Sequence, residues 1–372
     1  MQMKRVSMLV MAVVLACGTS AMAQNRGNAA PAVVSPEVAA DKKVTFRINA
    51  PKASEVTLTG DWLPPNTPAK LAKDEKGIWS VTLGPMEPGF MIYSYTVDGV
   101  AMADPVNPKI KLRANTSASL VEVPGDGKQL WEIQDVPHGK MELNYIPSKV
   151  LNGQTREVRV YTPPGYNPAA ATTYPILYLL HGDNDTAAGW TDVGRANYIF
   201  DNLIAQKKAV PMIVVTPFGH AVPRGQPNNN PVFEKYLLED VMPAVEKAYK
   251  ITPGRDNRAI TGYSMGGGQA LSIGLSHVDL FSAVGGFSPA IPGDLQAGTY
   301  AALWNNAADT NAKLHTLYIA CGKGDSLFSR SQQLDTFWKS KNINHTFSPS
   351  EGYHNFINWR LYLGEMAPML FK

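Results

Sequence analysis

Short segments of alternating apolar and polar residues fill the chain between residues 41 and 125. Pairs rich in Gly, Pro and Asp, such as Gly60-Asp61 and Asp98-Gly99, separate these segments. A period of two places alternate side chains on one face of a strand, and short strands joined by turns are typical of an antiparallel β-sandwich. We therefore predict a small β-sandwich over residues 41–125, with strands at 44–48, 56–59, 79–83 and 91–97.

After about residue 139 the pattern changes to continuous apolar runs that alternate with segments of helical period. Continuous runs are typical of parallel strands buried on both faces. Strands that alternate with helices predict a parallel sheet with crossover connections, and so an α/β domain over residues 139–372. The expected strands are 156–161, 174–180, 212–216, 258–261, 282–287 and 316–320, and the expected helices are 196–207, 233–248, 269–276 and 329–341.

The first 23 residues have the pattern of a secretory signal peptide. Lys4 and Arg5 precede a short apolar core, and Ala21-Met22-Ala23 fits the small residues of a cleavage site. We therefore predict export to the periplasm or the extracellular space, without a membrane span because the apolar run is too short. Residues 14–17 loosely resemble a lipoprotein box, so an outer-membrane lipoprotein anchored at Cys17 is the alternative.

Two further segments are predicted linkers, and the charge and cysteine content exclude some partners and cross-links. Residues 24–40 are rich in Ala, Asn, Pro and Val, and residues 126–138 resemble a connection between domains. The net charge of +3 over 372 residues does not indicate a nucleic-acid partner. Cleavage at Ala23 would leave Cys321 as the sole cysteine, which excludes a disulfide within the mature chain.

The stretch Gly262-Tyr-Ser264-Met-Gly266 fits the nucleophile elbow G-x-S-x-G of α/β serine hydrolases. It lies between the predicted strand 258–261 and the predicted helix 269–276. The two glycines leave room on a sharp strand-to-helix turn, and the helix dipole favours negative charge at the serine. We therefore predict that Ser264 is a nucleophile.

A serine nucleophile needs a histidine base, which in these hydrolases follows it in the chain. His354 lies in a loop after a predicted strand, where the sites of open α/β sheets assemble. His277, His315 and His345 are predicted to lie elsewhere, on a helix or near strand starts. We therefore predict His354 as the base.

The base needs an acid to orient it. Asp325 follows the predicted strand 316–320, at the carboxyl end of the sheet, and lies between Ser264 and His354 in the chain. Asp294, in a Pro-Gly loop, and Asp335, on the outer side of a predicted helix, are alternatives that we expect to be solvated.

Two backbone amides are expected to form an oxyanion hole. The first is the N–H of Met265, directly after the nucleophile, and the second is the N–H of Asp183, in the loop after strand 174–180. His181 is expected to brace that loop. The histidines show no metal-ligand spacing, and a serine triad needs neither a metal nor a cofactor, so none is predicted.

The domain that carries these residues resembles carbohydrate esterase family 1, which contains feruloyl esterases, acetyl xylan esterases and esterase D-like hydrolases. The resemblance implies an α/β-hydrolase fold, triad roles for Ser264, Asp325 and His354, and an oxyanion role for Met265. The residues that carry it are Tyr178–Gly182, Trp190, Leu237–Asp240, Gly262–Gly267, Gly322, Asp325, Gly352, His354 and Trp359.

The first domain resembles the family 48 carbohydrate-binding modules and their immunoglobulin-like relatives. The matching stretches are Val44–Ala53, Val56–Trp62, Gly77–Trp79, Tyr93–Gly99 and Asp104-Pro105. The resemblance implies an immunoglobulin-like sandwich. It leaves open whether Trp62 and Trp79 contact glycan or pack structurally, and whether the module only shapes the active site.

The two resemblances together imply a secreted feruloyl esterase that removes hydroxycinnamoyl groups from plant arabinoxylan through an acyl-enzyme. Trp190 and Phe287 are predicted walls of an aromatic acyl pocket. An acetyl xylan esterase would need a smaller pocket. A siderophore esterase of the enterobactin type would need clustered cations, but Arg195 and Arg224 are isolated. A glycan-binding protein with an inactive hydrolase domain is the remaining alternative.

Overall fold

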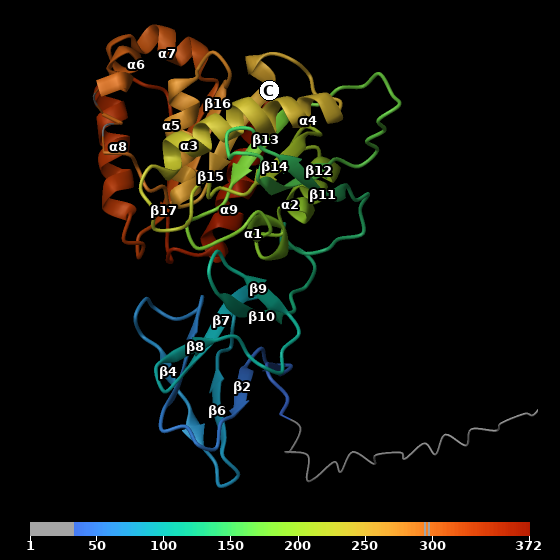
Figure 1. The fold of residues 1–372 in the computed structure, drawn as a ribbon, viewed down its shortest axis with the longest axis vertical. Helices are drawn as coiled ribbons and strands as arrows, with labels where there is room; N and C mark the ends of the chain where they lie inside the picture. The colour runs from blue at the N-terminus through green and yellow to red at the C-terminus, as the bar shows by residue number, and fades with distance from the viewer. Residues whose placement is uncertain (1–32, 294, 297) are drawn as a thin grey trace, which may run out of the picture. The chain divides into compact units, whose positions relative to one another are not determined.

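Two antiparallel sheets form the N-terminal part of the protein, drawn in blue to cyan in Figure 1. The computed structural model describes residues 33–293, 295–296 and 298–372, so the predicted signal peptide and Cys17 lie outside it. One sheet has the strand order β1-β2-β6-β5, and the other has the order β4-β3-β7-β10-β9 with β8 beside β7. Their bounds are β1 Glu37–Val38, β2 Val44–Asn49, β3 Val56–Gly60, β4 Ala69–Lys70, β5 Ala72–Lys73, β6 Ile78–Leu83, β7 Gly89–Val97, β8 Val100–Met102, β9 Ile110–Leu112 and β10 Ser117–Val123.

Both sheets contribute to one hydrophobic core, which includes Phe46, Leu58 and Tyr93. The apolar positions of the predicted strands in this region are therefore mostly the buried ones, as the alternation predicts. We call residues 34–123 the N-terminal β-region; its immunoglobulin-like topology stays a prediction. Trp79 is buried and its Nε1 donates to the Ala50 carbonyl at 2.9 Å, while Trp62 stacks on Phe46 at 5.3 Å between ring centroids. These contacts favour the packing role for both tryptophans.

Strand structure in this region is already present before residue 41, where the sandwich was predicted to start. Strand β1 lies inside the predicted linker 24–40 and pairs with β2. In the same segment, the buried Ser35 Oγ donates to Asp104 at 2.6 Å. The second predicted linker, 126–138, is also bound to its surroundings, because Asn202 Nδ2 donates to the carbonyls of Leu130 and Glu132 at 2.8 and 2.9 Å. Neither segment has the turn and alternation signals from which the sequence predicts structure.

Within the described residues, the C-terminal region contains an eight-stranded sheet with the order β11-β12-β14-β13-β15-β16-β17-β18. Strands β11 and β12 are antiparallel to their neighbours, and β14 to β18 are joined in parallel, which confirms the predicted α/β class. The edge strand β11 was not expected from the sequence. The bounds are β11 Lys140–Pro147, β12 Thr155–Thr162, β13 Ile176–Leu180, β14 Ile213–Pro217, β15 Arg258–Gly262, β16 Ala283–Phe287, β17 Thr316–Gly322 and β18 Thr346–Ser350.

Helices cover both faces of this sheet (Figure 1). Residues of α1, α2 and α9 enter one hydrophobic cluster, and residues of α3 to α8 enter the other. The helix α9, directly after His354, was also not expected from the sequence. The helices are α1 Gly189–Asp192, α2 Ala196–Ala205, α3 Asn229–Lys235, the π-helical turn η1 Tyr236–Val241, α4 Met242–Ala248, α5 Met265–Ser276, α6 Ala301–Asn305, α7 Ala307–Lys313, α8 Phe328–Ser340 and α9 Phe356–Met366.

Polar contacts join the N-terminal β-region to the C-terminal region, and residues 34–372 form one compact unit. The fully buried Arg360 of α9 donates to the carbonyls of Val193 and Phe90. The buried Lys111 of β9 forms an ion pair with Asp185, in the loop after β13. Each contact satisfies a buried charge, so removing one partner would leave the other charged or polar group unpaired at the boundary between the two regions.

Candidate active site

Ser264 lies on a strained turn between β15 and α5. Its backbone has φ 55° and ψ −119°, which is unfavourable for any residue with a side chain. The turn is held by a hydrogen bond from the Ser264 N–H to the Phe287 carbonyl, at 2.9 Å. A Cβ atom on Gly262 would lie 2.6 Å from the Leu180 carbonyl oxygen, and one on Gly266 would lie 2.5 Å from that of His181. The close approach of β13 therefore requires both glycines of the motif.

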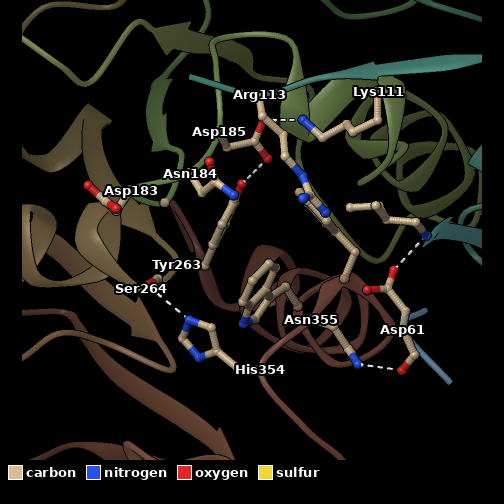
Figure 2. Close-up of a pocket in the computed structure, with 14 residues that line it drawn as sticks. Asp61, Lys111, Arg113, Asp183, Asn184, Asp185, Tyr263, Ser264, His354 and Asn355 are labelled. Atoms are coloured by element: carbon tan, nitrogen blue, oxygen red, sulfur yellow. Dashed lines mark hydrogen bonds and ion pairs between the residues drawn. The ribbon is translucent and has the colours of Figure 1, made fainter. Parts of the chain in front are cut away.

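The structure brings Ser264, His354 and Asp325 together, although they are far apart in the chain. The Ser264 Oγ lies 2.9 Å from His354 Nε2, and His354 Nδ1 lies 2.7 Å from Asp325 Oδ2. All three follow the ends of parallel strands in the same sheet: β15, β18 and β17. Figure 2 shows the contact between Ser264 and His354 at the edge of a pocket. The geometry is that of a nucleophile, a base and an orienting acid.

Asp325 is buried beneath the imidazole. Burial alone would raise the pKa of this carboxyl, but its hydrogen bond with His354 and the N–H of Leu327 outweigh that effect and hold the pKa below its ordinary value. The carboxylate is therefore ionised at neutral pH. An ionised acid at Nδ1 keeps the proton there and leaves Nε2 as the acceptor that faces Ser264.

The amides of Met265 and Asp183 lie beside the serine. Among the described residues, neither N–H donates to a protein acceptor. The Asp183 loop is fixed from outside the pocket, because its carbonyl accepts from His220 at 2.6 Å and its carboxylate pairs with Arg224 at 2.6 Å. Gly182 allows this approach, since a Cβ there would lie 3.2 Å from the Ser264 Cβ. Two unpartnered donors next to Ser264 have the arrangement that an oxyanion hole requires.

His181 lies at the start of the Asp183 loop, and its ring forms hydrogen bonds with the backbone and not with Ser264. Its Nδ1 lies 2.8 Å from the Gly182 carbonyl, and its Nε2 accepts from the Gly219 N–H at 2.7 Å. Burial lowers the pKa of His181 to about 4, so the ring is neutral. This agrees with the bracing role that the sequence predicts.

A cavity of about 320 Å³ opens at Ser264. Three aromatic residues form one of its walls: Tyr263, Phe356 and Trp359. Tyr263 stacks on Trp359 with 3.9 Å between ring centroids, and the rings of His354 and Trp359 form a T-shaped pair at 90°. The wall therefore combines the base with planar apolar surface.

The N-terminal β-region supplies another side of this cavity through Asp61, Ile92, Lys111 and Arg113. Figure 2 shows Asp61, Lys111 and Arg113 away from Ser264 and His354. That this region could shape the active site was left open above, but these four residues could not be picked out, because they occupy ordinary turn and strand positions. Asp185, which joins Lys111 to the Tyr263 hydroxyl, was likewise not predicted. Only the docking of the two regions brings these side chains to the pocket.

The prediction that Trp190 and Phe287 line the pocket is wrong. Both are fully buried, and neither borders the cavity. The Trp190 Nε1 donates to the Leu180 carbonyl at 2.9 Å, and its ring packs edge-on against Phe287, Tyr263 and Phe356. The two residues instead support the pocket wall from behind.

The alternative acids and bases are engaged elsewhere. Asp335 is buried rather than solvated, and its carboxylate contacts His345 at 3.0 Å and Lys339 at 2.9 Å. His277 Nε2 lies 2.7 Å from Glu234. Asp294 lies outside the described residues. Within the described part of the chain, no group of three His, Cys, Asp or Glu side chains could hold a metal, and no helix has the length and apolarity to cross a membrane.

Comparison with known proteins finds relatives of both regions. The family model described as "Putative esterase" matches residues 148–370. An endo-1,4-beta-xylanase/feruloyl esterase of Xylanibacter ruminicola is 29% identical over 347 residues, which cover 91% of this chain and 46% of that protein. The chain spans about half the length of the first curated relatives that it matches.

Solved structures of similar fold include two kinds of esterase. A ferulic acid esterase matches 62% of this chain and 97% of its own, with 27% identity and a TM-score of 0.55. The enterobactin esterase of Shigella flexneri matches 88% of this chain and 92% of its own, with 18% identity and a TM-score of 0.62. The second match, at this low identity, shows a similar fold that includes the N-terminal β-region.

Proposed function

The chain belongs to the esterase family whose model matches residues 148–370, and from this premise we propose that it is a serine carboxylic-ester hydrolase that acts on feruloylated plant arabinoxylan. The single observation that supports the chemistry best is the continuous contact from Ser264 Oγ through His354 to Asp325, at 2.9 and 2.7 Å. The predicted esterase class agrees with the family.

In the proposed reaction, His354 Nε2 takes the proton of the Ser264 hydroxyl while Oγ attacks the ester carbonyl. The amides of Met265 and Asp183 stabilise the oxyanion of the tetrahedral intermediate. His354 then gives its proton to the departing alcohol, and an acyl-enzyme is left. Water, activated by the same histidine, attacks that ester; the acid is released and the serine proton is restored.

The size and lining of the pocket support an aromatic acyl group. A cavity of about 320 Å³ with Tyr263, Phe356 and Trp359 along one wall offers planar apolar contact beyond what an acetyl group could use. The relative from Xylanibacter ruminicola carries the feruloyl esterase name and matches through both regions. Arabinoxylan as the carrier of the ester, and export of the enzyme with or without a lipid anchor at Cys17, belong to the same proposal.

A substrate panel tests the proposal. We expect the wild-type protein to hydrolyse methyl ferulate and to release ferulate from feruloylated arabinoxylan, with a higher kcat/KM than for acetylated xylan. Ser264→Ala is the matched control, because it removes only the nucleophilic oxygen. A preference for acetylated xylan would reject the substrate, and turnover by Ser264→Ala would reject the mechanism.

A siderophore esterase is the second candidate, because the enterobactin esterase fold matches through both regions and cations border this pocket. Of these cations, Lys111 is neutralised by Asp185, and Arg113 lies in a pocket that also contains Asp61. This balance of charge favours a neutral aromatic ester over an anionic iron chelate. Hydrolysis of a catecholate siderophore in the same panel, faster than that of methyl ferulate, would favour the second candidate.

A further inference from the structure

Asp61 occupies an unusual position, because it belongs to the N-terminal β-region and yet borders the cavity at Ser264. It follows strand β3 directly, and three of its polar groups are fixed. Its N–H donates to the Ile92 carbonyl at 3.1 Å, its carbonyl accepts from Asn355 Nδ2 at 2.9 Å, and its Oδ2 accepts from the Ile92 N–H at 2.8 Å. Asn355 is the neighbour of the base His354, so Asp61 is held in a fixed relation to the reactive loop.

The second carboxylate oxygen of Asp61, Oδ1, has no hydrogen-bond partner among the described residues. Figure 2 shows Asp61 across the pocket from Ser264 and His354. A fixed carboxylate with one unpartnered oxygen at a pocket wall is a strong acceptor that lacks a donor. The structure therefore leaves room for a donor that a ligand would supply.

Arg113 is directed into the same pocket (Figure 2), and within the described part of the chain its guanidinium makes no hydrogen bond or ion pair with a protein side chain. Burial raises the pKa of Asp61 to about 6, against the lowering effects of the Ile92 N–H and of the cations Arg360, Arg113 and Lys111. Lys111, Arg113, Asp183, Asp185, His354 and the Tyr263 hydroxyl are the other titratable groups that line this pocket. At neutral pH the site thus offers an ionised acceptor beside a cationic donor.

We propose that Asp61 is a specificity-determining residue, whose Oδ1 accepts a hydrogen bond from the phenolic hydroxyl of a hydroxycinnamoyl ester held with its carbonyl at Ser264. Arg113 donates to the oxygen substituents of the same ring end. The aromatic wall of Tyr263, Phe356 and Trp359 lies along the planar part of the acyl group. This inference rests on the proposed function and predicts a preference for cinnamoyl esters that carry a free phenolic hydroxyl.

The test compares two esters that differ at the phenolic oxygen: methyl ferulate, which has the hydroxyl, and methyl 3,4-dimethoxycinnamate, in which a methyl group replaces its proton. Asp61→Asn keeps an acceptor for the Ile92 N–H and replaces the unpartnered oxygen by an NH₂ donor. We expect kcat/KM for methyl ferulate to fall about 10- to 100-fold, and that for the dimethoxy ester to change by less than about 3-fold.

Asp74→Asn is the matched control, because Asp74 Oδ1 also accepts from backbone N–H groups of the β-region, those of Lys76 and Ile78, but it does not border the pocket. We expect this variant to retain the wild-type ratio between the two esters. Arg113→Gln is a second pocket variant. Both esters carry the ring oxygens to which Arg113 would donate, so we expect it to lower kcat/KM for both about 3- to 10-fold and to leave their ratio near the wild-type value. Should Asp61→Asn fail to fold, the ratio for the wild-type protein at pH 7 and at pH 5 tests the same carboxylate, and a ratio that does not vary with pH would overturn the inference.

Three outcomes would overturn the inference. The first is an equal loss on both esters, which a merely structural role of Asp61 would produce. The second is an unchanged ratio in folded Asp61→Asn, and the third is a loss confined to feruloylated arabino-oligosaccharides, which would assign Asp61 to the sugar. Failure of the wild-type protein on both methyl esters would instead remove the proposed function, and this inference with it.

Discussion

The two sides of the pocket are built by different means. On the catalytic side, Ser264, Asp325 and His354 each follow the carboxyl end of a parallel strand, so a single sheet sets their separation. On the other side, Asp61 follows β3 and Lys111 lies in β9, so their positions depend on contacts between two regions. We therefore predict that the proposed reactive groups depend on the α/β sheet alone, and that the proposed selection of the acyl group depends on the N-terminal β-region as well.

The largest effect should come from the catalytic side alone. Ser264→Ala is expected to lower kcat on methyl ferulate by roughly a million-fold, because the acyl-enzyme can no longer form. The unfolding temperature should be nearly unchanged, since Ala also fits the turn after β15. Single-turnover assays with thermal melts would measure both quantities, and a residual kcat within a hundred-fold of wild type would contradict a nucleophilic serine.

Asp325 and Asp335 each contact a histidine, so variants of the two separate an effect on the reaction from an effect on stability. Asp325→Asn is expected to lower kcat about ten-thousand-fold, because the His354 ring loses the anion that orients it. Asp335→Asn is the matched control, since Asp335 contacts His345 and not the base. It should lower stability and leave kcat within about 2-fold. Steady-state kinetics that gave the opposite ranking would move the acid role to Asp335.

The contact between the regions can be broken at Lys111. Lys111→Met leaves the buried Asp185 without its cation, and we expect a loss of about 3–5 kcal/mol in the free energy of unfolding. Asp185→Asn on the same background should restore part of this loss, because the unpaired charge is removed. Denaturant unfolding of the two single variants and the double variant measures the coupling free energy between Lys111 and Asp185. Additive losses would show that this ion pair does not stabilise the contact between the two regions.

The smallest expected effect is a pH dependence of selectivity. The pKa of about 6 for Asp61 means that its carboxyl is protonated below that pH and then donates a hydrogen bond where it had accepted one. The ratio of kcat/KM for methyl ferulate to that for methyl 3,4-dimethoxycinnamate should therefore fall severalfold between pH 7 and 5. Protonation of the base affects both esters alike and cancels in the ratio. Asp61→Asn should give a ratio that does not vary with pH.

The catalytic side could be predicted from the sequence because each member has a local signal. The elbow marks Ser264, and chain order with strand ends marks Asp325 and His354. The structure brings these three together, and their roles stay proposals until tested. Trp190 and Phe287 were misplaced because an aromatic residue near an elbow can fill the core as readily as line a pocket, and here both fill the core.

The other side could not be predicted, because its residues have no such signal. Asp61 resembles any turn aspartate, and Lys111 resembles a solvated charge on an alternating strand, yet its side chain is only 2% exposed. Helix α9 was missed because polar residues such as Asn358 and Arg360 lie on its buried side, which obscures the helical period. Strand β11 was missed because Met141, Leu143 and Tyr145 are exposed, so its alternation does not reflect burial.

The hydrogen bond from the Tyr263 hydroxyl to Asp185 has a consequence for protein engineering. The residue next to the nucleophile is tethered, through one carboxylate, to a lysine of the preceding region. A truncated esterase that begins at residue 139 would lack Lys111 and would leave the Asp185 carboxylate without its cation, next to the nucleophile elbow. A chimaera that replaces the N-terminal β-region by that of another enzyme would therefore have to keep Lys111 and strand β9.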